Sequence, residues 1–131
     1  MDTTLEYRTR KWIRGKHLNP RETLFGGTLL AWIDEEAAIF AYCQLKTPLI
    51  VTKFMSEIDF VNPAYQGDVI EIGVEQVSIG NTSITLAVEV RNKDTQKTII
   101  KVDKIIFVRI DKHGKPKRHN ISGENEDVQE N

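Results

Sequence analysis

Two acidic residues, Asp34 and Glu36, stand inside an apolar stretch of the sequence, where a carboxylate can do chemistry. A carboxylate among apolar residues can act as a general base on water, or it can attack a carbonyl carbon directly as a nucleophile. At helical contact spacing Asp34 has mainly small neighbours, Ala31, Ala37 and Ala38, and these leave room for another molecule or another backbone. Bulky residues surround Glu36 and would pack over its stem. The helix phase alone does not choose between the two carboxylates, and a side chain that simply reaches solvent or a hydrogen-bond donor is the commoner case.

Phe25, Gly26 and Gly27 directly precede this stretch and predict a loop. Glycine lets the backbone turn tightly and lets a ligand approach the main chain. The first N–H groups of a helix have no partner within the helix, and the helix dipole favours negative charge there. A carbonyl oxygen bound at this point would be polarised, as in an oxyanion hole. A glycine pair by itself is weak evidence, but its place before an acidic helix favours a functional loop.

One helix and five strands are expected to position these residues. Residues 28–44 contain no Gly or Pro and predict the only long helix. Nearly its whole circumference is apolar, so it must be buried by the sheet, by a second subunit or by both. Alternating residues between turn signals predict strands at 4–14, 50–60, 69–78, 82–91 and 97–110. Because short turns require antiparallel pairing, the predicted class is α+β, with one helix buried against an antiparallel sheet.

The strand predicted at 50–60 is expected to be regular. With a period of two, one face of this strand would carry a mixture of polar and apolar side chains: Thr52, Phe54, Ser56, Ile58 and Phe60.

The composition is that of one soluble domain. The chain has 131 residues, with 18 Lys and Arg against 19 Asp and Glu, and this balance gives no general reason to expect nucleic acid as a partner. No apolar run approaches the ~20 residues of a membrane span, and the polar start of the chain lacks the apolar core of a secretory signal. Cys43 is the only cysteine, so we expect a reduced, cytoplasmic setting. No cluster of His, Cys and carboxylates has the spacing of metal ligands, so no metal is expected.

Two parts of the chain carry a resemblance to a known family. Residues 17–27, which include Asn19 and the Phe-Gly-Gly triplet, and residues 29–38 around Asp34 resemble the hotdog-fold acyl-CoA thioesterases. Residues 58–63 and the Gly67-Asp68 pair are also similar to that family. The resemblance covers roughly residues 5–115 and is closest to the branch that hydrolyses long-chain or broad-range acyl-CoA. It implies a hotdog fold, in which a sheet of five or six antiparallel strands wraps one long helix.

The resemblance also implies a reaction and the residues that perform it. By resemblance, the protein hydrolyses the thioester of fatty acyl-CoA to free acid and CoA, with Asp34 as the catalytic carboxylate in the role of general base or nucleophile. Asn19, fifteen residues upstream, matches the polar partner of the family. Gly26 and Gly27 match the turn that presents main-chain N–H groups to the thioester carbonyl. Coenzyme A is part of the substrate, and no separate cofactor is implied.

Family members form dimers through their sheets and build each active site from two subunits, so the resemblance implies a homodimer as the minimal unit. Asp34 and Asn19 would then face each other across the interface, and a trimer of dimers or a tetramer is the implied larger assembly. Two features depart from the family pattern. Glu36 stands where small residues often stand, and a basic stretch at residues 112–118 precedes an acidic tail without a family counterpart. We expect one domain over residues 1–118 and a disordered tail over residues 119–131.

Several further residues are candidates for binding the substrate. The phosphates of CoA require cations, although each candidate also fits an ordinary solvated charge: Lys53, Arg91, Lys115, Lys117 and Arg118. The turn from Ser78 to Ser83, around Gly80, is a candidate to lie along the pantetheine arm. Phe25, beside the glycine pair, is a candidate contact for the acyl group.

Two other functions are compatible with the same fold. A hydratase or dehydratase acting on acyl thioesters needs a base for a carbon-bound proton, usually a His. In this chain no His precedes residue 113 within the predicted helix or strands, and His17 falls in a loop. A non-catalytic acyl-CoA binding or sensor module would keep the glycine loop and would not need Asp34.

Overall fold

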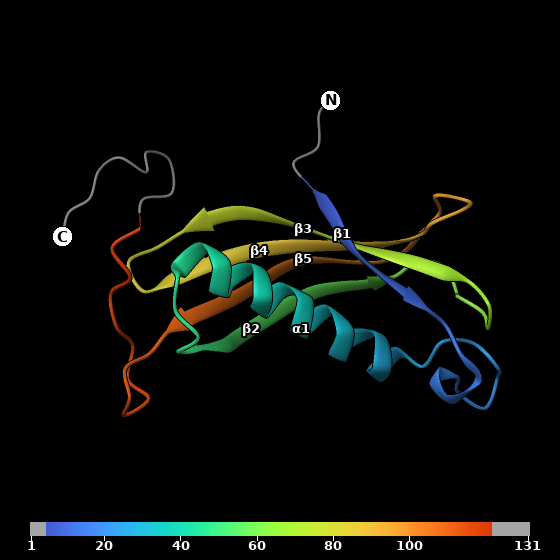
Figure 1. Cartoon of the computed structure of the whole chain (residues 1–131), viewed down its shortest axis with the longest axis horizontal. Helices are drawn as coiled ribbons and strands as arrows, with labels where there is room; N and C mark the ends of the chain where they lie inside the picture. The colour runs from blue at the N-terminus through green and yellow to red at the C-terminus, as the bar shows by residue number, and fades with distance from the viewer. Residues whose placement is uncertain (1–4, 122–131) are drawn as a thin grey trace.

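Within residues 5–121, the part of the chain that the computed structural model describes, five strands form one antiparallel sheet and a single long helix lies along one of its faces (Figure 1). The strand order is β1-β3-β4-β5-β2, so β1 and β2 are the two edges. None of the helices in this range is long and apolar enough to cross a membrane. The elements are β1 (Glu6–Trp12), the short 3-10 helix η1 (Gly15–His17), α1 (Gly26–Leu45), β2 (Ile50–Phe60), β3 (Val69–Ile79), β4 (Ser83–Asn92) and β5 (Thr98–Arg109).

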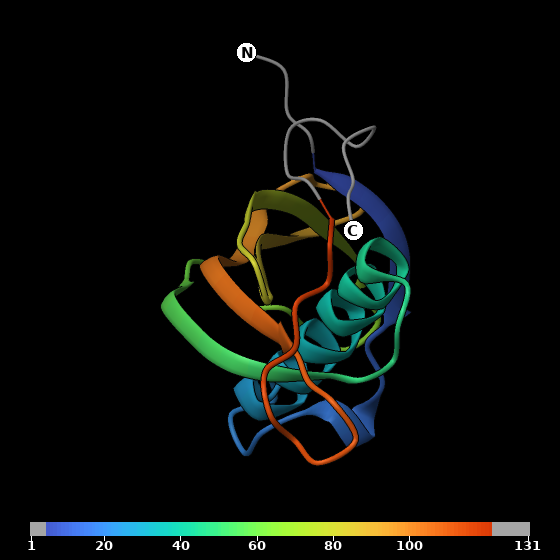
Figure 2. The same cartoon turned by 90° about the vertical axis from the view of Figure 1, so that its left-hand side faces the viewer.

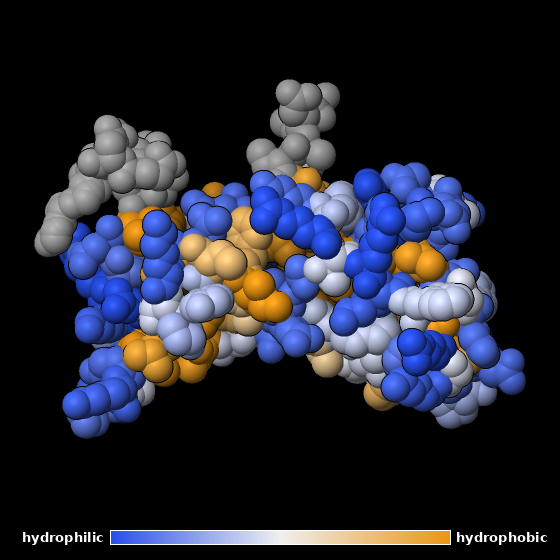
Figure 3. All heavy atoms as spheres, viewed as in Figure 1, coloured by the Kyte–Doolittle hydropathy of each residue, from blue (hydrophilic) through white to orange (hydrophobic). Residues whose placement is uncertain are grey.

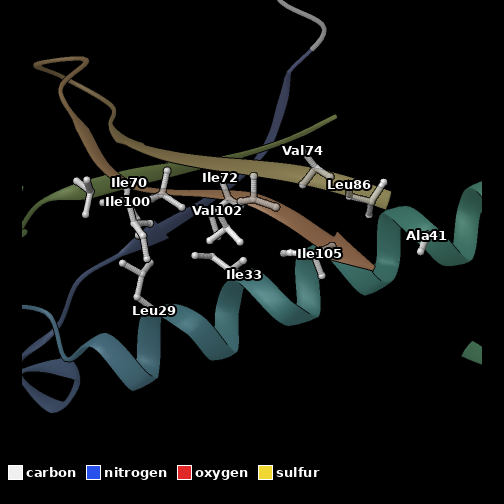
Figure 4. Close-up of a cluster of buried hydrophobic side chains, with 14 of the residues drawn as sticks. Leu29, Ile33, Ala41, Ile70, Ile72, Val74, Leu86, Ile100, Val102 and Ile105 are labelled. Atoms are coloured by element: carbon white, nitrogen blue, oxygen red, sulfur yellow. The ribbon is translucent and has the colours of Figure 1, made fainter. Parts of the chain in front are cut away.

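One side of α1 supplies the helix's share of the core. Its fully buried residues recur every four positions, which keeps them on one side of the helix: Leu29, Ile33, Ala37, Ala41 and Leu45. They pack against inward-facing side chains of the sheet such as Ile72 and Ile105 (Figure 4). Burying each Leu or Ile contributes about 1.5–3 kcal/mol to stability. The sheet curves around the helix (Figure 2), which confirms the predicted hotdog architecture with its five-stranded sheet.

The other side of α1 is not covered by its own sheet. Ile39 and Tyr42 are each 48% exposed, and Figure 3 shows apolar side chains gathered over the C-terminal half of the helix. The sequence predicted burial by the sheet, by a second subunit or by both. Since the sheet buries only one stripe of α1, apolar surface remains for a second chain to cover.

The helix begins two residues earlier than predicted. Gly26 and Gly27 were expected to form a loop before it, but they are its first two residues, and Phe25 is the N-cap. The prediction failed because a glycine pair signals a turn only where the backbone needs a positive φ, and neither glycine has one. The side chain of Phe25 makes no capping hydrogen bond. At the other end, Lys46 adopts the left-handed conformation, with φ at 60°, and its N–H donates to Tyr42 O at 2.7 Å.

Strand β2 is less regular than predicted. Thr52 pairs with Phe107 and Phe54 pairs with Ile106, so the register shifts between the two β2 residues. Because consecutive residues of β5 point to opposite faces, Thr52 and Phe54 cannot share a face, and that part of the prediction was wrong. Glu57, further along the strand, has a positive φ of 56°. The bulge turns Thr52 toward α1 on the face that carries the buried Phe107.

The outer face of the sheet carries a charged cluster on three strands. Glu71 on β3 accepts hydrogen bonds from Arg10 Nε on β1 and from Arg91 Nε on β4, each at 2.9 Å. The guanidinium of Arg91 also lies over the ring of Tyr7, 3.6 Å from its centroid. The Arg91 hydrogen bond, with a smaller contribution from Arg10, holds the pKa of Glu71 below its usual value against the opposing effect of burial. Arg91, a candidate for the CoA phosphates, is therefore already engaged within the fold.

After β5 the chain doubles back to form a segment that we call the C-terminal strap, residues 111–121. A turn closed by the hydrogen bond from Asp111 N to Lys115 O reverses the chain, and Lys117 N then donates to Arg109 O. The strap continues across the end of the sheet beside α1 (Figure 2). Ile121 packs against the core, so the packed part of the chain extends past the predicted domain boundary at residue 118. The rest of the predicted tail, residues 122–131, lies outside the described residues.

Candidate active site

Asp34 lies in the middle of α1, half-buried, and faces the edge strand β2. Its Oδ1 accepts a hydrogen bond from Thr52 Oγ1 at 2.8 Å. Among residues 5–121 no other hydrogen bond and no ion pair reaches this carboxylate. A carboxylate held by a single hydroxyl keeps most of its lone pairs available to a water molecule or a substrate. The bulge in β2 brings the Thr52 hydroxyl to this position.

Thr52 was not among the residues predicted for the site. It was considered only as one member of a strand face. Eighteen residues separate it from Asp34, and their contact depends on the helix–sheet packing and on a bulge. The only signal in the sequence was a hydroxyl residue early in the strand that follows the helix.

Glu36 lies elsewhere on the helix surface. Two residues correspond to about 200° of rotation around an α-helix, so Glu36 points away from Asp34 and from β2. It is half-buried, and in the described part of the chain no hydrogen bond or ion pair holds it. Of the two carboxylates that the sequence could not distinguish, only Asp34 is oriented by a polar partner.

Asn19 closes the loop before the helix. Its Oδ1 accepts from the backbone N–H of Arg21 at 2.9 Å and of Thr23 at 3.1 Å, and its Nδ2 donates to Thr23 Oγ1 at 3.0 Å. An Asn amide carries two N–H groups, so one of them remains available. The side chain can therefore donate one hydrogen bond to a ligand, while its oxygen is occupied by the loop.

A hollow of about 320 Å³ opens beside Asn19 and the start of α1. Its wall includes Gly26, Leu29 and Phe60. A Cβ on Gly26 would lie 3.3 Å from the Phe60 ring, and a Cβ on Gly27 would lie 2.8 Å from the Phe25 ring. The two glycines thus allow aromatic rings to pack directly on the first turn of the helix. Asn19 and Gly26 line the same hollow, and the N–H groups of the first helical turn have no partner within the helix.

Asp34 does not line this hollow. Seven residues of α-helix separate Gly27 from Asp34, a rise of roughly 10 Å. A single thioester carbonyl cannot contact both positions at once. Within one chain the structure therefore brings Asn19 and Gly26 together, and it leaves Asp34 with Thr52 as a separate group.

The predicted substrate-binding residues fall in three places. Phe25 lies exposed at the helix start, and Lys53 lies exposed on β2 next to Thr52. The third place is formed by the β3–β4 turn, which holds Gly80 and Ser83, and by the C-terminal strap, which carries the exposed Lys115 and Lys117 and bonds to the turn through His119. In that turn Gly80 N donates to Ser83 O at 3.0 Å.

His17 has a structural environment. Its ring packs edge-on against Trp32 with the centroids 4.9 Å apart, and its Nδ1 accepts from Arg14 N at 3.0 Å. Partial burial lowers the pKa of His17, with further lowering by the charges of Lys16 and Arg14. Since both its ring face and its Nδ1 are engaged, His17 is poorly placed to act as the base of a hydratase.

The comparison of the sequence with known families settles which family it is. Residues 22–99, well over half of the chain, match the thioesterase superfamily. The chain belongs to the thioesterase superfamily. One relative of this thioesterase-superfamily chain is an uncharacterized acyl-CoA thioester hydrolase of Bacillus subtilis, with 31% identity over 103 residues. The match covers 75% of this chain and 58% of the relative. It is 30% identical over 105 residues to an uncharacterized acyl-CoA thioester hydrolase of Buchnera aphidicola. That match covers 76% of this chain and 77% of the relative. The chain thus spans little more than half the length of the Bacillus relative.

Solved structures of thioesterases share its fold. The hexameric thioesterase from Yersinia pestis has a TM-score of 0.80 and 25% identity, covering 88% of this chain and 96% of that one. The acyl-CoA hydrolase of Staphylococcus aureus, solved with butyryl-CoA and CoA, has a TM-score of 0.76 and 31% identity, covering 84% and 66%. The hexameric hotdog-fold thioesterase of Campylobacter jejuni has a TM-score of 0.73 and 28% identity, covering 86% and 89%. These likenesses confirm the hotdog fold predicted from the sequence.

Proposed function

We propose that this thioesterase-superfamily chain hydrolyses the thioester of fatty acyl-CoA to free acid and CoA, with Asp34 as the catalytic carboxylate. The observation that carries the proposal is the pairing of Asp34 with Thr52, because it presents an available carboxylate on the long helix of a thioesterase fold. The names of the relatives from Bacillus subtilis and Buchnera aphidicola, both acyl-CoA thioester hydrolases, support the substrate class.

The proposed chemistry needs a base or nucleophile and a group that stabilises negative charge. As a general base, Asp34 takes a proton from water, the water oxygen bonds to the thioester carbon, and the C–S bond then breaks; such catalysis contributes typically ~10²–10⁴-fold. As a nucleophile, Asp34 forms a mixed anhydride that water cleaves. The hydroxyl of Thr52 orients the carboxylate in both routes. The leaving thiolate is a weak base, so no strong general acid is required.

The N–H groups of Gly26 and Gly27 and the remaining N–H of Asn19 are proposed to bind the carbonyl oxygen. One such donor typically contributes ~3 kcal/mol to transition-state stabilisation. Because these donors and Asp34 lie far apart within one chain, we propose that a second copy supplies the donors to each Asp34. Each dimer would then hold two active sites, each with Asp34 from one chain and Asn19 from the other.

The edge strand β2 is the proposed interface. It carries Thr52, and along its length it exposes a row of large apolar side chains, some on each face of the strand, that one chain leaves uncovered: Val51, Phe54, Ile58 and Phe60. Pairing two copies along β2 would cover this row and bring the loop of one chain to the Asp34 of the other. The hexameric neighbours from Yersinia pestis and Campylobacter jejuni support a trimer of such dimers.

Variants of the Staphylococcus aureus hydrolase offer a parallel. Its structures include forms in which an aspartate, an asparagine or a threonine is replaced by alanine. The asparagine precedes the aspartate by fifteen residues there, as Asn19 precedes Asp34 here, and the threonine follows by seventeen residues rather than eighteen. This spacing supports one functional set formed by Asn19, Asp34 and Thr52.

The remaining substrate contacts are proposed along the same dimer. Phe25 would contact the acyl group, Gly80 and Ser83 the pantetheine arm, and Lys115 and Lys117 the phosphates. Lys53, beside Thr52 on β2, is a further candidate cation for the phosphates. Coenzyme A enters only as part of the substrate, and the cytoplasmic location remains a prediction.

The first experiment follows free thiol release from a panel of acyl-CoA esters of increasing chain length. Native protein is compared with Asp34→Asn, which keeps the shape and removes the base, and with Glu36→Gln as the matched control. We expect the Asp34 variant alone to lose activity, about 10²-fold or more. Full activity in Asp34→Asn would overturn the assignment. If native protein binds CoA esters without hydrolysing any, the chain is a binding module instead.

A second experiment tests the shared site. Asp34→Asn and Asn19→Ala are each expected to be nearly inactive. When the two are mixed and allowed to exchange subunits, half of the dimers contain both variants and one intact site, so activity should return to about a quarter of the native value. No recovery despite proven exchange would overturn the proposal that each site combines Asp34 of one chain with Asn19 of the other.

A further inference from the structure

His119 is the buried polar residue that joins the C-terminal strap to the sheet. Its side chain is almost fully buried, with 4% of the residue exposed. Its ring Nε2 lies 3.0 Å from Ser83 O, and its Nδ1 accepts the N–H of Ile121 at 3.0 Å. The backbone N–H of His119 donates to Asn81 O at 3.1 Å. Three hydrogen bonds thus fix this residue between the strap and the β3–β4 turn.

The hydrogen bonds determine the tautomer. Because Nδ1 accepts from Ile121 N–H, the ring proton is on Nε2, which donates it to Ser83 O. The same carbonyl also accepts Gly80 N–H at 3.0 Å, the bond that closes the turn. A Cβ on Gly80 would lie only 2.6 Å from Ser83 Oγ, so the Ser83 hydroxyl packs directly against Gly80 in the turn. Ser83 O is therefore shared between the turn and the imidazole.

The strap also presents cations that its own fold leaves available. Lys112, Lys115, Lys117 and Arg118 are all exposed, and within residues 5–121 no carboxylate lies at salt-bridge distance from any of them. Oδ1 of the nearby Asp111 accepts the N–H groups of His113 and Lys115. Several cations on one segment, with no carboxylate partner among residues 5–121, favour a ligand with several negative charges, such as the phosphates at the nucleotide end of CoA.

We propose that His119 is a positioning residue, which holds the β3–β4 turn and the cationic strap together as one rigid surface for the phosphate-bearing end of the thioester substrate. This inference rests on the proposed acyl-CoA hydrolysis and adds a residue to it. His119 does not touch the thioester in this scheme. It acts through Ser83 and the strap, so its loss weakens substrate binding and leaves the bond-breaking step unchanged.

The test compares three variants on two thioesters. His119→Ala removes both side-chain bonds, His119→Asn can keep only the local bond to Ile121 N–H, and His119→Gln can restore a donor to Ser83 O. The substrates are an acyl-CoA and the matching acyl-pantetheine, which lacks the nucleotide and its phosphates. For acyl-CoA we expect KM to rise about tenfold in His119→Ala and His119→Asn and to stay near the native value in His119→Gln. The kcat should be the same in all three variants. For acyl-pantetheine we expect a clearly smaller rise in KM in the Ala and Asn variants, because this substrate lacks the phosphates and keeps only the contacts proposed between the pantetheine arm and the turn with Gly80 and Ser83.

The outcomes separate this inference from the proposed function. If native protein hydrolyses both thioesters and the His119 variants slow both equally, His119 supports only the general fold and the inference fails. An unchanged KM for acyl-CoA in His119→Ala also overturns it. If native protein hydrolyses neither thioester, the proposed function fails. The inference about His119 is then tested by calorimetry with CoA alone. In that experiment His119→Ala should bind CoA about tenfold more weakly than native protein and His119→Gln do.

Discussion

Two carboxylates of this molecule, the buried Glu71 and the half-buried Asp34, differ in the polar groups that hold them. Glu71, on the outer face of the sheet, is bonded by two guanidinium groups from neighbouring strands. Asp34, on the helix, is bonded by one hydroxyl. Both are acids held in place by the fold, but only Glu71 has its charge balanced by its own chain.

The difference shows how to tell a structural carboxylate from a functional one. A carboxylate whose oxygens are taken by two cations is held in its ionised form and has little capacity left for a ligand. A carboxylate with one neutral donor is oriented but remains available as a base. The polar partners, rather than burial alone, therefore distinguish the two roles.

The largest expected effect comes from removing the available carboxylate. Asp34→Asn should reduce kcat for acyl-CoA hydrolysis by about 10²-fold or more, because a neutral amide cannot act as a base or nucleophile. Its unfolding free energy should stay close to native, since Asn can still accept the Thr52 hydrogen bond. Thiol-release kinetics and denaturant unfolding on the same samples check both halves of this statement. A large loss of stability would instead assign Asp34 a role like that of Glu71.

Removing the balanced carboxylate should have the reverse effect. Glu71→Gln should lower the unfolding free energy at pH 7 by about 1.5–3 kcal/mol, the usual value for hydrogen bonds to charged groups, and leave kcat unchanged. Because the folded-state pKa of Glu71 is lowered, its stabilisation is present above the unfolded value of 4.5 and is lost as pH falls through the folded pKa. Denaturant unfolding at fixed protein concentration should show the difference from native protein shrinking toward zero in acid. A difference that persists at low pH would refute the electrostatic explanation.

A smaller effect is expected from the hydroxyl that orients Asp34. Thr52→Val keeps the shape and should lower kcat about three- to tenfold, the equivalent of one neutral hydrogen bond. Thr52→Ser keeps the hydroxyl and serves as the matched control, with nearly native activity. Steady-state kinetics of both variants measure this effect. Equal kcat values for Thr52→Val and Thr52→Ser would show that the Thr52 hydroxyl is not needed to orient Asp34.

The smallest effect sharpens the choice between the two helix acids. Glu36→Gln should change kcat and stability little, with kcat staying within about twofold of native, because the described residues give Glu36 no polar partner and it faces away from β2. The same kinetic assay measures it alongside Asp34→Asn. A loss comparable with that of Asp34→Asn would mean that the wrong carboxylate had been chosen.

The sequence predicted nearly all of the fold, because its signals are local. Alternation along each strand and turn residues between strands located all five strands, and the absence of Gly and Pro located the helix. The two errors depended on longer-range structure. Gly26 and Gly27 signalled a loop but are helical, and the bulge near Thr52 is set by the pairing of β2 with β5. Neither could be derived from neighbouring residues.

The candidate site divides in the same way. Asp34, Asn19 and the glycine pair could be proposed from the sequence because they fall in one continuous stretch with recognisable spacing. The Asp34–Thr52 bond, the engagement of Arg91 by Glu71 and the contact of His119 with Ser83 all join residues from different elements. Such contacts exist only after the sheet has formed, so residue types alone do not reveal them.

The uncapped start of the helix has a consequence for protein engineering. Phe25 provides no side-chain acceptor for the first turn of α1, and replacing such a residue by Ser or Asp commonly stabilises a protein by about 1 kcal/mol. At this position a cap that accepts from Gly27 N–H would take up one of the donors that the substrate carbonyl is proposed to use. A thermostability screen that selects Phe25→Asp would then recover folded, more heat-resistant protein with impaired turnover, an example of stability gained at the expense of activity.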